Sequence, residues 1–266
     1  MTKNVVFITA VNYPEKIDYA QFCFDTWQAW CEKNNARLFI WDTQKAKTDT
    51  MRPTWMRYRM FEILDQQGIH FDRAAMVDAD TMVRRDCPNF FNIAANRFCV
   101  VRDNRRSRWV KKSIRVYRHL FPGVHLDSND YFNAGFMIVN REHRPLFKAM
   151  LDFYNARDTH LRRLIREHRM GSDQTPLNFI VAKSGYKKKY LPREFNYMHF
   201  IPLVFRNRFL AERFPLKNFL KKGYIFHFTG MNKTLNKRFM ARTREAMEKN
   251  YERTDLSEGI DYHTGL

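Results

Sequence analysis

The sequence lacks the features that define several common classes of protein. Its four cysteines form no C-x-x-C pair and have no histidine at zinc-ligand spacing, and a chain of 266 residues does not need disulfides, so we expect free buried thiols in a reducing compartment. No apolar run approaches the ~20 residues of a membrane-spanning helix. There is no G-x-x-x-x-G-K phosphate loop, internal repeat or low-complexity linker. These absences favour one folded, cytoplasmic unit.

Acidic residues are scarce relative to basic ones. The chain has 47 Lys and Arg against 28 Asp and Glu, a formal net charge of +19. Charge of this size bears on partners and not on fold. Nucleic acid, an anionic membrane surface and a phosphate-rich substrate all fit it, as does a solvated basic surface. Segment 102–118 combines eight Lys and Arg with Trp109 and Tyr117, which is typical of a basic helix or a flap.

Apolar residues, by contrast, are plentiful and predict a β-α-β-α-β order. We expect strands over 5–9, 37–41 and 74–77, with helices over 19–34 and 54–67. This order is typical of a largely parallel sheet with helices on both faces. Ligands bind beyond the carboxyl ends of the strands in such sheets, so we expect the site where the first and third strands end, at Thr9 and Asp78.

The rest of the chain is less regular. We expect a strand over 132–140, helices over 144–154, 159–168 and 172–184, and a late strand over 224–228. Ser172 is the predicted N-cap of the third of these helices. We expect one compact domain of the size of an enzyme over residues 1–240 and a helical tail over 241–266.

Two aspartates follow the third expected strand. Their D-x-D spacing alone is weak, because the chain has 17 Asp. Two carboxylates at the end of a buried strand are costly unless a cation pairs with them. A hard divalent cation such as Mn²⁺ or Mg²⁺ takes oxygen ligands and can bridge to a diphosphate. Asp78 and Asp80 therefore predict a metal site, unless they are solvated or paired with Arg84 and Arg85.

Three distant segments can complete such a site. His227 ends the late strand and precedes Gly230 and Lys233, so this segment can supply a metal ligand and a cation for phosphate, although a strand-end histidine is more often structural. The stretch Asn133-Ala134-Gly135 inside an apolar run indicates a close backbone approach, or an amide that faces a ligand. The stretch 171–174 is either a helix cap or a source of a carboxylate and an amide for a substrate.

Taken together, these motifs resemble the family 8 retaining glycosyltransferases, which include glycogenin and the bacterial lipopolysaccharide galactosyl- and glucosyltransferases. The matching stretches, in the family's order, are Met76-Val77-Asp78-Ala79-Asp80-Thr81, Tyr131-Phe132-Asn133-Ala134-Gly135, Ser172-Asp173-Gln174 with Leu177-Asn178, and His227-Phe228-Thr229-Gly230 with Lys233. The sequence departs from the family after Lys233, where Thr234-Leu235 stand in place of Pro-Trp.

The resemblance implies a GT-A fold, which is an α/β, Rossmann-like fold with a mostly parallel sheet. It also implies transfer of a hexose, with retention, from a nucleotide sugar such as a UDP-sugar to a glycan or glycolipid acceptor. The implied ligands of Mn²⁺ (or Mg²⁺) are Asp78, Asp80 and His227. The implied donor contacts are Thr9, Tyr13 or Tyr19, Arg57, Asp78, Ala79, Gly230 and Lys233, and the residues implied to face the transferred sugar are Asn133, Asp173 and Gln174.

Two other classes of function stay open on the sequence. The basic charge and interleaved aromatics allow a nucleic-acid-binding protein, although no binding module is recognisable and the basic residues are spread along the chain. A metal-dependent nucleotidyl or phosphoryl transferase would also need two carboxylates at a strand end. The same charge would draw the protein to an anionic membrane, so we expect a cytoplasmic protein with peripheral contact at the membrane face.

Overall fold

A six-stranded mixed sheet forms the centre of the molecule. The computed structural model describes residues 3–10, 17–42, 51–103, 107–168, 172–198, 216–229 and 233–258. The strands, in sheet order, are β2 (Ala36–Asp42), β1 (Asn4–Ala10), β3 (Arg73–Asp78), β6 (Phe132–Asn140), β5 (Phe98–Arg102) and β7 (Lys188–Tyr190). β6 runs antiparallel to both of its neighbours, and the other pairs are parallel. The mostly parallel α/β sheet that the sequence predicts is confirmed.

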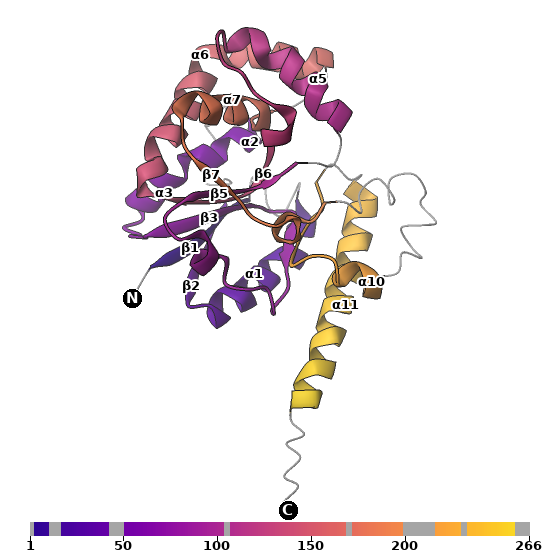
Figure 1. Ribbon diagram of the computed structural model, residues 1–266. Coiled ribbons are helices and arrows are strands. Elements are labelled where there is room, and N and C mark those ends of the chain that lie inside the picture. Colours follow the sequence, from indigo (N-terminus) through magenta and orange to yellow (C-terminus); the bar gives the residue numbers. More distant parts are fainter. Residues whose placement is uncertain are drawn as a thin grey trace, which may run out of the picture.

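Helices cover both faces of this sheet (Figure 1). One face packs against α2 (Pro53–Met56), α3 (Met60–Gln66), α5 (Ser107–Tyr117), α6 (Arg144–His168) and α7 (Gln174–Ser184), and the other against α1 (Gln21–Lys33) and α4 (Phe90–Ala94). Successive strand residues point to opposite faces, so Val5 and Phe7 join the first core while Val6 and Ile8 join the second.

A two-stranded sheet lies beside the main one. β4 (Thr81–Val83) pairs antiparallel with β8 (Ile225–His227). A third apolar cluster joins this sheet to α10 (Leu216–Leu220) and to α11 (Lys233–Glu258), which extends away from the body of the molecule in Figure 1. The domain boundary expected at residue 240 falls inside α11.

Two helix predictions are wrong in detail. The helices expected over 144–154 and 159–168 are one helix, α6, because the intervening Asn-Ala-Arg-Asp contains no glycine or proline and Asp158 pairs with Arg162 one turn later. The helix expected over 54–67 is divided by a 3₁₀ turn at Arg57–Arg59, where the side chain of Arg57 turns back to the carbonyl of Thr54.

The predicted cap of the helix over 172–184 is also wrong. α7 begins at Gln174 and its N-cap residue is Asp173, not Ser172. The hydroxyl of Ser172 pairs with that of Thr54, and the carboxylate of Asp173 accepts a hydrogen bond from Tyr58 in place of a capping bond. Both side chains therefore bond to the segment 54–58, which includes Arg57.

Other expectations can be compared directly with the structure. Segment 102–118 forms helix α5 over Ser107–Tyr117, and residues 104–106 lie outside the described part. All four cysteines are free and buried, as expected. Among the described residues, no helix is both long and apolar enough to cross a membrane.

Candidate active site at the carboxyl edge of the sheet

Strand pairing brings the predicted site residues to one edge of the sheet. β1 and β3 are parallel and place Thr9 opposite Asp78, so the two strands end together as expected. The chain then turns through Ala79 and Asp80 into β4. Because β4 pairs with β8, Thr81 lies opposite His227, and this pairing carries His227 to the two aspartates.

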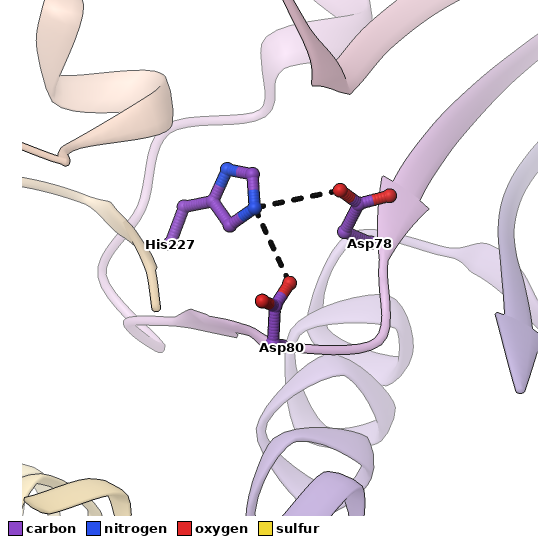
Figure 2. Close-up of side chains that lie close together, drawn as sticks. All are labelled: Asp78, Asp80 and His227. Carbon is purple, nitrogen blue, oxygen red and sulfur yellow. Dashed lines mark ion pairs between the residues drawn. The ribbon is translucent and has the colours of Figure 1, made fainter. Parts of the chain in front are cut away.

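The three predicted metal ligands lie together (Figure 2). The Nε2 atom of His227 lies 3.4 Å from Oδ2 of Asp78 and 3.2 Å from Oδ1 of Asp80. The three side chains offer ligand atoms that all lie within 4.8 Å of one another. The His227 side chain is 1% exposed, and its Nε2 atom has no hydrogen-bond partner. This nitrogen is therefore buried between two carboxylates, within ion-pair distance of both when the ring is protonated but without a hydrogen bond.

Neighbouring charges shift the pKa values of His227 and Asp78. Burial alone would lower the pKa of His227, but the carboxylates of Asp80 and Asp78 outweigh it and raise the pKa from 6.5 to about 9. Burial would raise the pKa of Asp78, but the positive charges of Arg57 and His227 lower it to about 2. Asp78 is therefore a carboxylate throughout the physiological pH range.

Gly135 allows the histidine ring to lie against β6. A Cβ atom at this position would fall 2.2 Å from Cε1 of His227 and 2.8 Å from Oδ2 of Asp78. No side chain can occupy that space without displacing the ring. The close backbone approach predicted from Asn133-Ala134-Gly135 is thus confirmed, and what approaches the strand is the ring of His227.

Arg57 joins two of the predicted carboxylates. Its Nη1 atom lies 2.6 Å from Oδ1 of Asp78 and donates to the carbonyl of Ala134 at 3.0 Å, and its Nε atom lies 3.6 Å from Oδ2 of Asp173. Asp173 is buried and accepts a hydrogen bond of 2.9 Å from the hydroxyl of Tyr58. Burial and the charge of Asp78 raise the pKa of Asp173, against the opposing effect of Arg57.

The two predicted amides lie beside one another, and the structure adds two residues that sequence reasoning missed. Asn133 donates to Gln174 at 2.8 Å, Gln174 donates to Asp103 at 2.9 Å, and Asn196 donates to Asn133 at 2.9 Å. Asp103 follows the apolar run of β5, so the strand-end signal that identified Asp78 could have found it. Nothing in the sequence around Asn196 marks it.

A cleft opens beside the carboxylates. It is lined by Thr9, Ile17, Tyr19, Pro53, Thr54, Arg57, Val77, Asp78, Ala79, Asp80 and Thr229. Four predicted donor contacts, Thr9, Arg57, Asp78 and Ala79, therefore share one surface with Tyr19, and the hydroxyl of Thr9 is buried there without a hydrogen-bond partner.

The remaining predicted contacts cannot be placed at this cleft. Tyr13 and Gly230 lie outside the described residues, as does the side chain of Lys233, the first residue of α11. Arg84, considered as a partner for the two aspartates, pairs instead with Asp86 and donates to the carbonyl of Leu220.

Comparison with known proteins identifies the fold. No protein-family model matches the chain, and no curated protein matches it significantly in sequence. The structure is similar to that of a glycosyltransferase involved in the glycosylation of the major capsid of PBCV-1, with 11% identity, coverage of 92% of this chain and 98% of that chain, and a TM-score of 0.50. It is also similar to the glycosyltransferase GlyE of Streptococcus pneumoniae TIGR4, with 13% identity, coverage of 96% and 64%, and a TM-score of 0.51. At these identities the likeness establishes the architecture, and the chain has the GT-A fold that its sequence predicts.

Proposed function

We propose that this chain is a metal-dependent glycosyltransferase that moves a hexose from a nucleotide sugar, in particular a UDP-sugar, to a glycan or glycolipid acceptor with retention of configuration. The observation that carries the proposal is the buried Nε2 atom of His227, which lies between the carboxylates of Asp78 and Asp80 without a hydrogen-bond partner. This group stands at the carboxyl edge of the sheet, where open α/β sheets bind their ligands.

The three side chains fit a divalent cation. They offer two carboxylate oxygens and one imidazole nitrogen within 4.8 Å of one another. Carboxylates suit Mg²⁺ and Mn²⁺, whereas imidazole suits transition metals, so the mixed set favours Mn²⁺. When the ring is neutral, its buried Nε2 lone pair faces two carboxylates without a donor, which is costly, and a ligand bond to a cation would remove that cost.

The cation would supply charge neutralisation on the nucleoside diphosphate as it leaves. The protein keeps the metal-binding side chains in place and in the charge state that binds a cation. Arg57 contacts Asp78 at 2.6 Å and contributes to the low pKa of that carboxylate, so Asp78 need not lose a proton before it binds. We assign Gly230 and Lys233 to the diphosphate, because they follow the strand that carries His227.

We assign the cleft to the donor and the buried polar group beside it to the transferred sugar. Thr9, Tyr19 and Ala79 line the cleft and would contact the nucleoside, as would Tyr13. Asn133, Asp173 and Gln174 would face the sugar, with the carboxylate of Asp173 held from behind by Tyr58 and Arg57. We therefore expect substitutions of the cleft residues to change the affinity for the nucleotide. Substitutions of Asn133, Asp173 or Gln174 should instead change the specificity for the sugar.

An activity assay tests the proposal. Release of nucleoside diphosphate from a panel of nucleotide sugars should require Mn²⁺ and stop with EDTA. Asp80→Asn removes one charge from the site and should lower turnover by at least ~100-fold, as loss of transition-state charge stabilisation does. Asp65→Asn, an exposed carboxylate that pairs with Arg144, is the matched control and should keep full activity. Full activity of Asp80→Asn in EDTA would refute the metal site.

We also propose that the basic surface meets an anionic acceptor or membrane. The exposed cations of α5 are Arg108, Lys111, Lys112 and Arg115. Anionic vesicles attract such a group at low ionic strength and release it at high salt. The protein should therefore co-sediment with phosphatidylserine vesicles at low salt. The double variant Lys111→Glu, Lys112→Glu should co-sediment less. Binding to duplex DNA at physiological salt without any nucleotide-sugar turnover would favour the nucleic-acid alternative instead.

A further inference from the structure

A line of polar side chains runs from the end of β5 to His227. Three carboxamides, Gln174, Asn133 and Asn196, form its middle, and we refer to them as the amide network. From Asp103 onward the successive hydrogen bonds are 2.9, 2.8 and 2.9 Å long. At the far end, Oδ1 of Asn196 lies 2.9 Å from Nδ1 of His227. Asn133, Asn196 and His227 are each at most 3% exposed, so water does not compete for these bonds.

The direction of these bonds is set by groups that can only donate. The backbone N–H of Ala134 donates to Oε1 of Gln174 at 3.3 Å, and that of Gly135 donates to Oδ1 of Asn133 at 2.8 Å. A backbone N–H is never an acceptor, so the oxygen ends of both carboxamides must face β6. Asn196 must then present its NH₂ group to Oδ1 of Asn133, which leaves its own oxygen facing His227.

Two further contacts hold Asn196 in this place. Asn196 ends the 3₁₀ helix Arg193–Asn196, and the next residue, Tyr197, forms a β-bridge with Phe226 of β8, the residue before His227. The N–H of Tyr197 donates to the carbonyl of Ile225 at 2.7 Å, and the N–H of His227 donates to the carbonyl of Tyr197 at 3.1 Å. The residue after Asn196 is thus bonded to the backbone of His227, which keeps the two side chains close together.

The consequence falls on the histidine ring. An oxygen acceptor opposite Nδ1 requires a hydrogen on Nδ1, so the lone pair of the neutral ring is on Nε2, which faces Asp78 and Asp80. On its other side the ring lies against Gly135, where a Cβ atom would clash with it. In metal sites an acceptor at the second imidazole nitrogen commonly fixes the tautomer and the ring orientation.

We propose that Asn196 is a positioning residue, which through the amide network holds His227 as the Nδ1–H tautomer with Nε2 directed at Asp78 and Asp80. The inference rests on the proposed metal site and extends it to a residue that touches neither cation nor substrate. The competing explanation is that Asn196 only satisfies buried polar groups and contributes to stability alone.

Metal titration separates the two explanations. Binding of Mn²⁺ to the full chain is measured from the loss of the free-ion electron paramagnetic resonance signal, without any donor sugar. Asn196→Leu removes the acceptor and should raise the Kd for Mn²⁺ by about 10- to 100-fold, as loss of an outer partner of a metal ligand does. Asn196→Asp keeps an acceptor for Nδ1–H but cannot donate to Asn133, so it should recover most of the affinity while remaining less stable than the parent.

Asn140→Leu is the matched control. Asn140 is also a buried carboxamide of β6 and bonds to Asn96 and Glu142 at the opposite end of the strand. Its loss should lower the melting temperature and leave the Kd for Mn²⁺ within about twofold, because distant sites act independently. An equal loss of affinity in Asn140→Leu, or unchanged affinity in Asn196→Leu, would overturn the positioning role.

A spectroscopic measurement distinguishes failure of this inference from failure of the metal site. Long-range ¹⁵N–¹H spectra of histidine-labelled, metal-free protein, recorded above the raised pKa of His227 so that the ring is neutral, report which ring nitrogen carries the hydrogen, and His227→Gln assigns the signal. The parent protein should show the Nδ1–H tautomer, and Asn196→Leu should show a mixture. If the parent binds no Mn²⁺, the proposed metal site fails, whereas an unchanged tautomer in Asn196→Leu contradicts the inference about Asn196 whether or not metal binds.

Discussion

Two buried histidines, His143 and His227, look alike in exposure and differ in everything that bears on function. They are 4% and 1% exposed, and each follows or ends a strand. The Nδ1 atom of His143 accepts a hydrogen bond from the backbone N–H of Asn140, and its ring lies beside those of Phe98 and Tyr186. Burial lowers the pKa of His143, while the carboxylates facing His227 raise its pKa to about 9. Burial alone therefore gives a neutral structural histidine, and the groups opposite the ring decide whether it can serve as a ligand.

The largest expected effect comes from exchanging each histidine for glutamine. His227→Gln removes a proposed metal ligand and should reduce Mn²⁺-dependent turnover by ~100-fold or more. His143→Gln loses a bond to the backbone of Asn140 and should reduce stability by about 1–3 kcal/mol without changing turnover per folded molecule. Thermal melts and initial rates of both variants check this contrast. Equal turnover in the two variants would remove the distinction between the histidines.

A smaller but still large effect is expected from a methyl group beside the ring. Gly135→Ala places a Cβ 2.2 Å from Cε1 of His227 and 2.8 Å from Oδ2 of Asp78, so these two side chains must shift from their present arrangement. We expect a loss of about 1–3 kcal/mol in stability, as for other overpacked sites, together with weaker Mn²⁺ binding. Gly185→Ala is the control. Its φ of 73° strains any other residue by roughly 1–2 kcal/mol, but no atom lies near the added Cβ, so Mn²⁺ binding should not change.

The pH dependence of stability compares the two histidines most directly. The unfolded chain has a histidine pKa of about 6.5. The raised pKa of His227 stabilises the metal-free fold fully below that value, and this contribution is lost as the pH rises from 6.5 to about 9. The lowered pKa of His143 has the opposite sign, because its contribution is present above pH 6.5 and is lost as the pH falls below it.

Melting temperatures of the metal-free protein across this pH range measure both contributions. His227→Gln should flatten the decline between pH 6.5 and about 9, and His143→Gln should flatten the decline below pH 6.5. Each kcal/mol corresponds to about 2–4 °C for a chain of this size. A decline that survives in both variants would assign the pH dependence to other groups.

Much of the main sheet could be read from periodicity and strand ends. The run that ends at Asp78 was recognisable because it is apolar, short and followed by acids, and the parallel pairing of β1 and β3 followed from the intervening helices. The reversed direction of β6 could not be read in this way, because its nine buried residues give no sign of which neighbour they pair with. The long helix α6 was predicted as two, since its exposed middle turn carries no apolar residue that continues the pattern.

The candidate site also contains residues that the sequence could predict and residues that it could not. The role of Asp78 and Asp80 as candidate metal ligands could be predicted from the sequence, and so could the close backbone approach at Gly135. Asn196 was missed because an isolated asparagine in a connecting segment has no pattern, and its proposed role comes from two partners that are distant in the sequence, Asn133 and His227.

The amino-acid sequence was sufficient to predict the α/β class, the strand that ends at Asp78 and Asp80, and the residue types that a cation would need. Those features depend on local periodicity and on the cost of placing carboxylates at the end of a buried strand. The sequence also indicated His227 as a candidate ligand, but it could not show that the Nε2 atom faces Asp78 and Asp80 while the ring of His143 lies beside Phe98 and Tyr186. Those surroundings depend on the pairing of β4 with β8, which brings together segments about 145 residues apart in the chain, and local sequence patterns do not specify such pairing.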